Sequence, residues 1–236
     1  MLTPQSLSRS LCLVLALFVG TAAAEPPVIQ PIGKDLSGWK YRGDKAKSKW
    51  MIGTAKLDKN DQTHLQVTSE GKELVNNAAH HGDGVDIYTA ARHGDAVIEV
   101  EFMIPKGSNS GVYVMGEYEV QILDSVGKPD SALKPSDIGG LYGASPPRTN
   151  ASKGHGEWQK FVIDFRAPKF DANGKKTANA KFVKVVLNDK VLHENVEMKG
   201  PTPTGVTGKE APTGPLMLQG NHGAISYRNI KITPVK

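Results

Sequence analysis

The sequence is poor in cysteine, with one thiol, Cys12, in 236 residues. Cys12 lies in the first 24 residues, where Arg9 is the only charge, residues 11–19 are apolar and residues 21–24, TAAA, offer a small-residue cleavage site. This order is typical of a secretory signal peptide. We therefore expect residues 1–24 to be removed, leaving a single exported domain, residues 25–236, in the periplasm or outside the cell. Such a chain has no disulfide, cysteine nucleophile or thiolate metal site.

The remaining sequence also lacks long apolar runs and clustered basic residues. No other apolar stretch has the length of a bilayer-spanning helix, so we predict no membrane span. Without Arg9, the formal net charge falls from +5 to +4, and the lysines are spread along the chain. A nucleic-acid-binding protein normally carries a basic stripe or a recognisable reading motif. We therefore predict no nucleic-acid partner.

Helical periodicity is scarce, whereas glycine (25 residues) and proline (15 residues) are frequent. Short segments with alternating apolar and polar side chains recur between turn signals, which is typical of β-strands. The clearest segments are residues 63–69, 86–89, 96–104, 109–123, 160–166, 182–193, 216–219 and 224–232. About ten to twelve such strands predict an all-β sandwich or jelly roll.

The central stretch, Asn109–Asp124, is predicted to form two strands joined at Gly116. If Tyr118, Val120 and Ile122 face the core, Glu119 and Gln121 share the opposite face, about 7 Å apart at ~3.3 Å per residue. A carboxylate beside an amide on a rigid strand suits a polar binding site. The alternative is a solvated sheet face, which antiparallel sheets commonly have.

A long segment without periodicity, residues 125–156, follows this hairpin and contains Tyr142. Because such long irregular segments in compact domains are usually functional or disordered, we expect it to form a wall of a binding site. Glu99 and Glu101 share the polar face of another strand and could form an acid–base pair, although hydration is the simpler interpretation. His80 and His81 lie in a loop and are further candidates.

Six ordered motifs, which cover nearly all of the chain after residue 24, carry a resemblance to a known family. They are GKDLSGW (33–39), NSGVY (109–113), EVQILD (119–124), GEWQ (156–159), GPLMLQGNHG (214–223) and YRNI (227–230). The sequence resembles the 3-keto-disaccharide hydrolase domain family in their order and spacing. The resemblance implies a concanavalin-like jelly roll of two curved antiparallel sheets, with a concave face that binds carbohydrate. Met115 and Asn221 depart from the family pattern, where arginine and aspartate are frequent.

The resemblance further implies cleavage of 3-keto-glycosides. A base removes the C2 proton, which the neighbouring ketone acidifies, and the C1 substituent leaves; water can then add, so that the net reaction is hydrolysis. It also implies a separate sugar 3-dehydrogenase that forms the ketone. We assign catalytic roles to Glu119 as base, His222 as acid or base and Arg228 as stabiliser of the enolate. The predicted substrate-binding residues are Asn109, Gln121, Asp124, Tyr142 and Gln219.

Several alternatives remain open at this level. Asp124 could cap a turn, Arg228 could form an ion pair with Glu119, and His222 could bond only to its turn. A divalent cation held by Glu119, His222 and Asp124 is chemically reasonable for stabilising an enolate, but no spacing motif demands it. The protein could also be a non-catalytic carbohydrate-binding module, because fold does not determine activity. The third possibility is an ordinary glycosidase using Glu99, Glu101 or Glu119.

Overall fold

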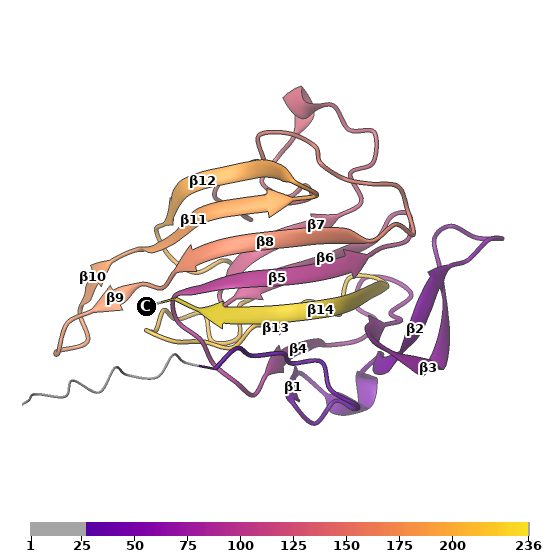
Figure 1. The fold of residues 1–236 in the computed structure, drawn as a ribbon, viewed down its shortest axis with the longest axis horizontal. Coiled ribbons are helices and arrows are strands. Elements are labelled where there is room, and N and C mark those ends of the chain that lie inside the picture. The colour runs from indigo at the N-terminus through magenta and orange to yellow at the C-terminus, as the bar shows by residue number, and fades with distance from the viewer. Residues whose placement is uncertain (1–26, 236) are drawn as a thin grey trace, which may run out of the picture.

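The computed structural model describes residues 27–235, so the predicted signal peptide and Cys12 lie outside the described residues. Within this range the chain forms two large antiparallel sheets and a small two-stranded one (Figure 1). The five-stranded sheet has the order β1-β4-β13-β6-β7, and the seven-stranded sheet has the order β12-β11-β8-β5-β14-β3-β2. The predicted all-β sandwich with jelly-roll architecture is thus confirmed.

The strands of the five-stranded sheet are β1 (Trp39–Arg42), β4 (Asp86–Thr89), β6 (Asn109–Val114), β7 (Tyr118–Leu123) and β13 (Met217–Leu218). Those of the seven-stranded sheet are β2 (Trp50–Leu57), β3 (Leu65–Asn76), β5 (Ala96–Met103), β8 (Gln159–Arg166), β11 (Ala180–Leu187), β12 (Lys190–Met198) and β14 (Ile225–Pro234). The remaining elements are β9 (Lys169–Phe170), β10 (Lys176–Ala178) and the 3-10 turns η1 (Lys45–Lys47) and η2 (Asp130–Ala132). In this part of the chain no helix has the length and apolar character of a membrane span.

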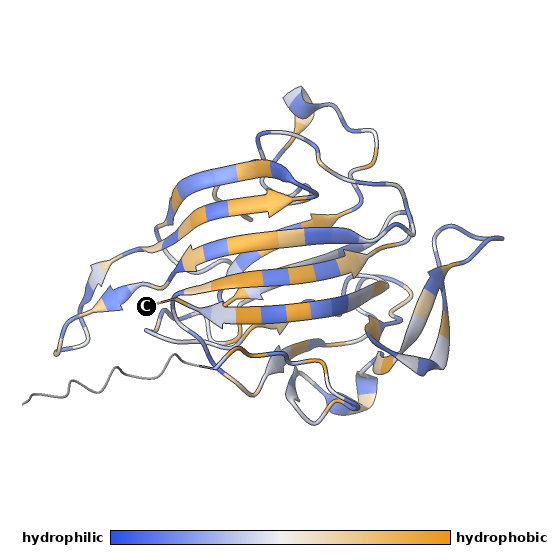
Figure 2. Ribbon diagram, viewed as in Figure 1, coloured by the Kyte–Doolittle hydropathy of each residue, from blue (hydrophilic) through white to orange (hydrophobic). Residues whose placement is uncertain are grey.

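The core lies between the two large sheets and follows the period of two along their strands. In β5 the buried side chains Ile98, Val100 and Phe102 alternate with Glu99 and Glu101. Figure 2 shows this alternation of hydrophobic and hydrophilic positions along β5, β8 and β14. The apolar sets from both sheets meet in one cluster, because each sheet must bury its hydrophobic face against another layer.

The β6–β7 hairpin forms one edge of the five-stranded sheet, and its free edge is covered. Gln121 N donates to Gly140 O and Gly139 N donates to Gln121 O, so part of the long segment 125–156 runs beside β7. Thr202 N donates to Glu117 O further along the same edge. This covering satisfies backbone groups that an exposed edge strand would leave free.

Sequence analysis missed some elements at the start of the chain. Neither β1 nor β2 was predicted, and β3 runs to Asn76, well beyond the predicted residues 63–69. Trp39 and Trp50, which begin β1 and β2, are buried and pack in the core. Asn188 and Asp189 both have positive φ, at 48° and 66°, and form the tight turn between β11 and β12, which divides the predicted segment 182–193 into two strands.

Candidate active site

A cavity of about 150 Å³ opens over β6 and β7 on the outer face of the five-stranded sheet. The strand register brings its floor together, because Tyr113 lies directly opposite Glu119 and Gly111 opposite Gln121. Six of the eight residues predicted as site residues line it, together with one further residue of β6 and two from the loop after β12. The full lining is Asn109, Tyr113, Glu119, Gln121, Tyr142, Pro203, Thr204, Gln219 and His222.

Glu119 is the most unusual group in the cavity. Its side chain is buried, and Oε1 has no hydrogen-bond partner among the described residues. Burial raises the pKa of Glu119 from 4.5 to about 8; the Tyr113 hydroxyl lowers it in part, and the charge of Asp86 raises it further. A buried carboxyl oxygen that lacks a partner inside a polar cavity is typical of functional sites, since such an atom is costly to keep.

Gly111 makes room for this carboxyl group. A Cβ atom at position 111 would lie 2.2 Å from Glu119 Oε1 and 3.0 Å from its Cδ. Any larger residue would therefore displace the carboxylate. The glycine of the NSG motif is thus needed here for close approach of a side chain across the strand pair.

Tyr113 and Thr204 form the side of the cavity next to Glu119. Their hydroxyl groups lie 3.0 Å apart, and burial, followed by the nearby Glu119 charge, raises the pKa of Tyr113. Tyr113 therefore stays protonated at neutral pH and can donate a hydrogen bond. Sequence analysis missed Tyr113, although it shares the parity of Asn109 and Gly111 on β6, which was the available signal.

Glu117 fixes the loop that carries Thr204. Its buried carboxylate accepts hydrogen bonds from Thr207 N and Oγ1, both at 2.8 Å, and from Gly208 N at 2.9 Å. On the same loop, Thr202 Oγ1 accepts from Glu119 N at 3.0 Å. The loop of residues 199–214 is therefore anchored to Glu117 and Glu119 by hydrogen bonds on either side of Pro203 and Thr204, its cavity-lining residues.

Three amide side chains supply the polar groups on the other side of Glu119. Gln121 Nε2 donates to Asn109 Oδ1 at 2.8 Å, which fixes the orientation of both groups. Gln219 follows β13, and its backbone N donates to Gly111 O at 3.0 Å. Its side-chain Oε1 is buried without a partner among residues 27–235. The cavity thus presents unsatisfied polar atoms that suit the hydroxyl groups of a sugar.

His222 enters the cavity from a turn that two other segments hold in place. Asn76 Nδ2 donates to Gly220 O at 2.8 Å and to Gly223 O at 2.9 Å, while Gly82 N donates to Asn221 O. The His222 ring packs edge-on against His81, with centroids 4.2 Å apart, and its Nδ1 contacts Asn221 Oδ1.

Burial, with His81 acting in the same direction, lowers the pKa of His222, although the charge of Asp86 opposes this. His222 is therefore neutral at pH 7. Since the Oδ1 of Asn221 is an acceptor, this contact favours the tautomer with the proton on Nδ1, which leaves Nε2 as an acceptor. Of the two adjacent histidines in the 78–84 loop, the structure brings His81 to His222.

Tyr142 closes the cavity from the segment beside β7. Its backbone N donates to Glu119 O at 3.2 Å, and the preceding residue, Leu141, bridges to Val120. The Tyr142 side chain is 39% exposed, so its ring is available to a ligand. The structure therefore places this part of the 125–156 segment at the wall of the cavity.

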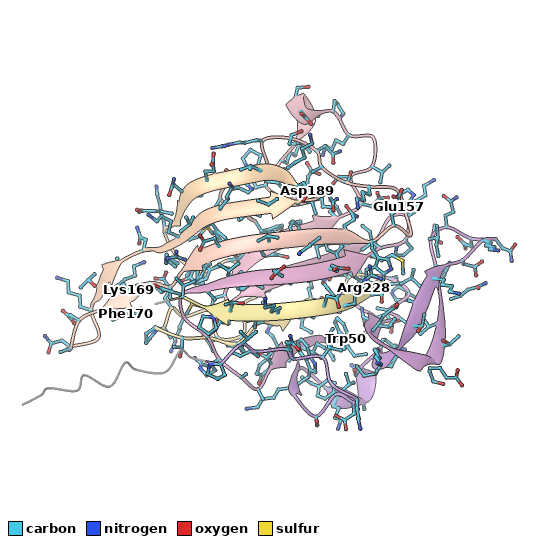
Figure 3. All side chains as sticks on the ribbon, viewed as in Figure 1. Trp50, Glu157, Lys169, Phe170, Asp189 and Arg228 are labelled. Carbon is cyan, nitrogen blue, oxygen red and sulfur yellow. The ribbon has the colours of Figure 1, made fainter. Side chains whose placement is uncertain are left out.

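Arg228, predicted to stabilise the enolate, does not reach the cavity, and the alternative of an ion pair with Glu119 is also wrong. Arg228 lies on β14 in the seven-stranded sheet, where its Nε donates to Glu101 Oε2 at 2.6 Å and its guanidinium lies 4.0 Å from the centre of the Trp158 ring. Figure 3 shows it on the sheet nearest the viewer, with β6 and β7 in the layer behind. Because the neighbouring Tyr227 points into the core, Arg228 points out of the sandwich on its opposite face.

Asp124 does not reach the cavity either. Its carboxylate accepts from Gly107 N at 2.8 Å and Val126 N at 3.2 Å, and it lies 2.9 Å from His155 Nε2. Burial raises its pKa, but these hydrogen bonds outweigh burial and leave the pKa lowered. This geometry is that of a turn-capping carboxylate.

The three candidate metal ligands therefore do not lie together at one site. Glu119 and His222 line one cavity, whereas Asp124 is bound to backbone N–H groups and His155 at the end of β7. Within residues 27–235 no group of three or more histidine, cysteine, aspartate or glutamate side chains is arranged to hold a metal ion. These residues do not fit the divalent-cation site that the sequence left open as an alternative.

The structure also separates the carboxylates considered for an ordinary glycosidase. Glu99 contacts Lys160 at 2.6 Å and Lys231 at 3.6 Å, and Glu101 contacts Arg228, all on the outer face of the seven-stranded sheet. Glu119 belongs to the other sheet. A glycosidase pair must flank one glycosidic bond, so Glu119 cannot pair with Glu99 or Glu101, and these two are engaged in ion pairs with Lys160, Lys231 and Arg228.

Comparison with known proteins assigns the class of this fold and site. Residues 31–233 match the family described as the 3-keto-alpha-glucoside-1,2-lyase-like domain, and the chain belongs to this family. A 3-keto-disaccharide hydrolase from Bacteroides thetaiotaomicron is 28% identical over an alignment of 155 residues that covers 56% of this chain and 49% of that protein. The match thus spans about half the length of this relative.

Solved structures from Parabacteroides distasonis, provisionally described as glycosyl hydrolases, share the fold. One has a TM-score of 0.65 and 27% identity, covering 86% of this chain and 81% of the other. Another has a TM-score of 0.58 and 20% identity, covering 89% of this chain and all of the other. The family resemblance predicted from the motifs is confirmed.

Proposed function

We propose that this protein is an exported enzyme that cleaves 3-keto-glycosides by elimination, with Glu119 as the base. The observation that carries the proposal is the buried carboxyl of Glu119, whose Oε1 lacks a partner, on the floor of a polar cavity. A base is most effective when its pKa lies near the working pH, and the value of about 8 is close to neutrality. Family membership supplies the class of substrate.

The proposed reaction begins when the Glu119 carboxylate removes the C2 proton, which the C3 ketone acidifies. The electron pair moves to the C3 oxygen as an enolate and then returns to form the C1–C2 double bond, while the bond from C1 to the leaving oxygen breaks. Glu119 can pass the proton to that oxygen. Addition of water across the double bond would convert the elimination product into the hydrolysed sugar.

Neutral donors, rather than Arg228, would stabilise the enolate oxygen in this scheme. The Tyr113 hydroxyl lies next to Glu119, and the amide groups of Gln121 and Gln219 line the same cavity. Hydrogen bonds in a water-poor cavity stabilise developing charge more strongly than in bulk water. His222, with Nε2 as acceptor, is suited to take a proton from a sugar hydroxyl or from the adding water.

The direct test is turnover of a 3-keto-glucoside with a chromogenic leaving group by residues 25–236. We expect release from the keto substrate and none from the unoxidised glucoside, with kcat/KM rising as Glu119 ionises towards pH 8. Glu119→Gln should abolish release while the variant remains folded. Parallel assays with and without EDTA report on a metal requirement.

Unchanged turnover by Glu119→Gln would remove Glu119 from the mechanism. Failure of the folded wild-type protein to act on the keto substrate, together with binding of unoxidised glycans, would instead support a non-catalytic carbohydrate-binding module. A separate sugar 3-dehydrogenase that supplies the ketone remains part of the proposal.

A further inference from the structure

A second hollow of about 470 Å³ adjoins the cavity, and it has no role in the chemistry described above. Tyr142 and Pro203 line both spaces. One wall is residues 142–144, and the other runs from the end of β12 through residues 199–203. We call this space the side groove.

The side groove meets β7 at Glu119 itself. The two segments that form its walls lie one after the other along the free edge of β7. Tyr142 N donates to Glu119 O at 3.2 Å, whereas Thr202 Oγ1 accepts from Glu119 N at 3.0 Å. The groove therefore begins at the backbone of the residue whose side chain forms the floor of the cavity.

The sizes of the two spaces suggest how a glycoside would be divided between them. A cavity of about 150 Å³ is small for a ligand site and leaves room for about one sugar ring. Any sizeable group attached at C1 must then lie outside it. The side groove is larger and shares two lining residues with the cavity, so it is the adjoining space that can receive this group.

The lining of the side groove points to an apolar occupant. Val196, Pro201, Pro203 and Ala144 contribute apolar surface, whereas Met198 is buried in the core; the exposed ring of Tyr142 lies at the junction. The charged side chains of Glu197 and Lys199 are exposed. Two prolines limit the motion of the wall, which lowers the entropic cost of binding.

We propose that the side groove is the leaving-group subsite and that it binds an apolar, preferably aromatic, aglycone. This inference rests on the proposed function, since it names the part of the 3-keto-glycoside that leaves. A substrate with an aryl group at C1 would place its sugar ring over Glu119 and its aryl group against Tyr142 and Pro203.

Gly200 allows the groove to be filled without disturbing the core. A Cβ atom at Gly200 meets nothing within 4 Å, and its backbone is not in the positive-φ region. Gly200→Phe should therefore fold and occupy the groove, and Ala144→Phe would do the same from the opposite wall. Gly33→Phe is the matched control, because a Cβ there meets only Asp35 O, at 3.9 Å, outside the groove.

The test compares kcat/KM for two substrates, a 2-naphthyl 3-keto-glucoside and 3-keto-glucosyl fluoride, whose small leaving group cannot fill the groove. Losing about 60 Å² of apolar contact corresponds to a roughly tenfold loss of binding. We expect Gly200→Phe and Ala144→Phe to lower the naphthyl-to-fluoride ratio of kcat/KM about tenfold. Gly33→Phe should leave both values unchanged.

An unchanged ratio in both groove variants, with the wild type active, would overturn the subsite while leaving the proposed function intact. If the wild type acts on neither substrate, the proposed function fails. In that case the subsite is tested separately, by measuring with calorimetry the affinities of the wild type for unoxidised 2-naphthyl glucoside and for methyl glucoside. A naphthyl preference that Gly200→Phe removes supports it, whereas equal affinities overturn it.

Discussion

Replacing Glu119 by glutamine is expected to make the protein more stable than the wild type at alkaline pH. The unfolded chain ionises this carboxyl near its ordinary pKa of 4.5, whereas the folded protein retains the proton until about pH 8. Between these values the folded state binds one more proton than the unfolded state. The free energy of unfolding of the wild type therefore falls as pH rises through this window.

The size of the effect follows from the pKa difference. A difference of about 3.5, at ~1.36 kcal/mol per pKa unit, gives an upper limit of roughly 5 kcal/mol. Relaxation around the ionised group and entry of water reduce it, so we expect about 2–4 kcal/mol. Glutamine has a similar shape and no charge, so its variant should lack this loss.

Urea denaturation of both proteins between pH 5.5 and 8.5 measures this difference directly. Glu101→Gln is the control from the opposite sheet. Burial raises the pKa of Glu101, but hydrogen bonds from Asn229 and Arg228 outweigh it, so the pKa is lowered. Glu101 is therefore ionised in both the folded and the unfolded protein throughout this range. The free energy of unfolding of Glu101→Gln should differ from that of the wild type by the same amount at every pH. Parallel stability curves for the wild type and Glu119→Gln would refute the buried, proton-retaining carboxyl.

Three further substitutions test the rest of the site. Gly111→Ala should reduce turnover of a 3-keto-glucoside at least tenfold with unchanged circular dichroism, because its Cβ would displace Glu119 Oε1; wild-type turnover would contradict this. Glu117→Ala should cost about 1–3 kcal/mol and increase hydrogen exchange in residues 202–208, since three hydrogen bonds are lost; unchanged exchange would argue against the anchoring role. Arg228→Leu should leave kcat unchanged and alter stability by about 1 kcal/mol or less; a large fall in kcat would restore Arg228 as a catalytic residue.

The sandwich and the polar face of β7 could be predicted because both depend on a local period of two. In β7, Val120 and Ile122 point into the core, so Glu119 and Gln121 must point the other way, whatever the partner strands are. The same rule places Asn109 on the outer face of β6, and it also places Tyr113 there, although Tyr113 was not predicted as a site residue. These predictions needed only the sequence within each strand.

The alternation of inward and outward side chains along a strand does not show to which sheet the strand belongs. This explains why Arg228 was wrongly predicted to act beside Glu119. Its alternation with Tyr227 gives the correct outward direction, but β14 pairs with β5 and β3 rather than with β6. An outward residue of the seven-stranded sheet lies on the far side of the sandwich from Glu119. Only the strand order, which arises from pairing between segments distant in sequence, separates the two faces.

The covering of β7 links the stability of the fold to the chemistry of Glu119. A free strand edge is a liability, so backbone groups of residues 139–142 and 202 pair with it. Two of these contacts, from Tyr142 and Thr202, converge on the backbone of Glu119, and the same two segments supply Tyr142, Pro203 and Thr204 to the lining around its side chain. Exclusion of water is the main cause of its raised pKa. The sequence of β7 was enough to predict that Glu119 points away from the core. It could not predict the raised pKa of Glu119, because the segments that surround this residue are irregular loops whose positions no periodicity reveals.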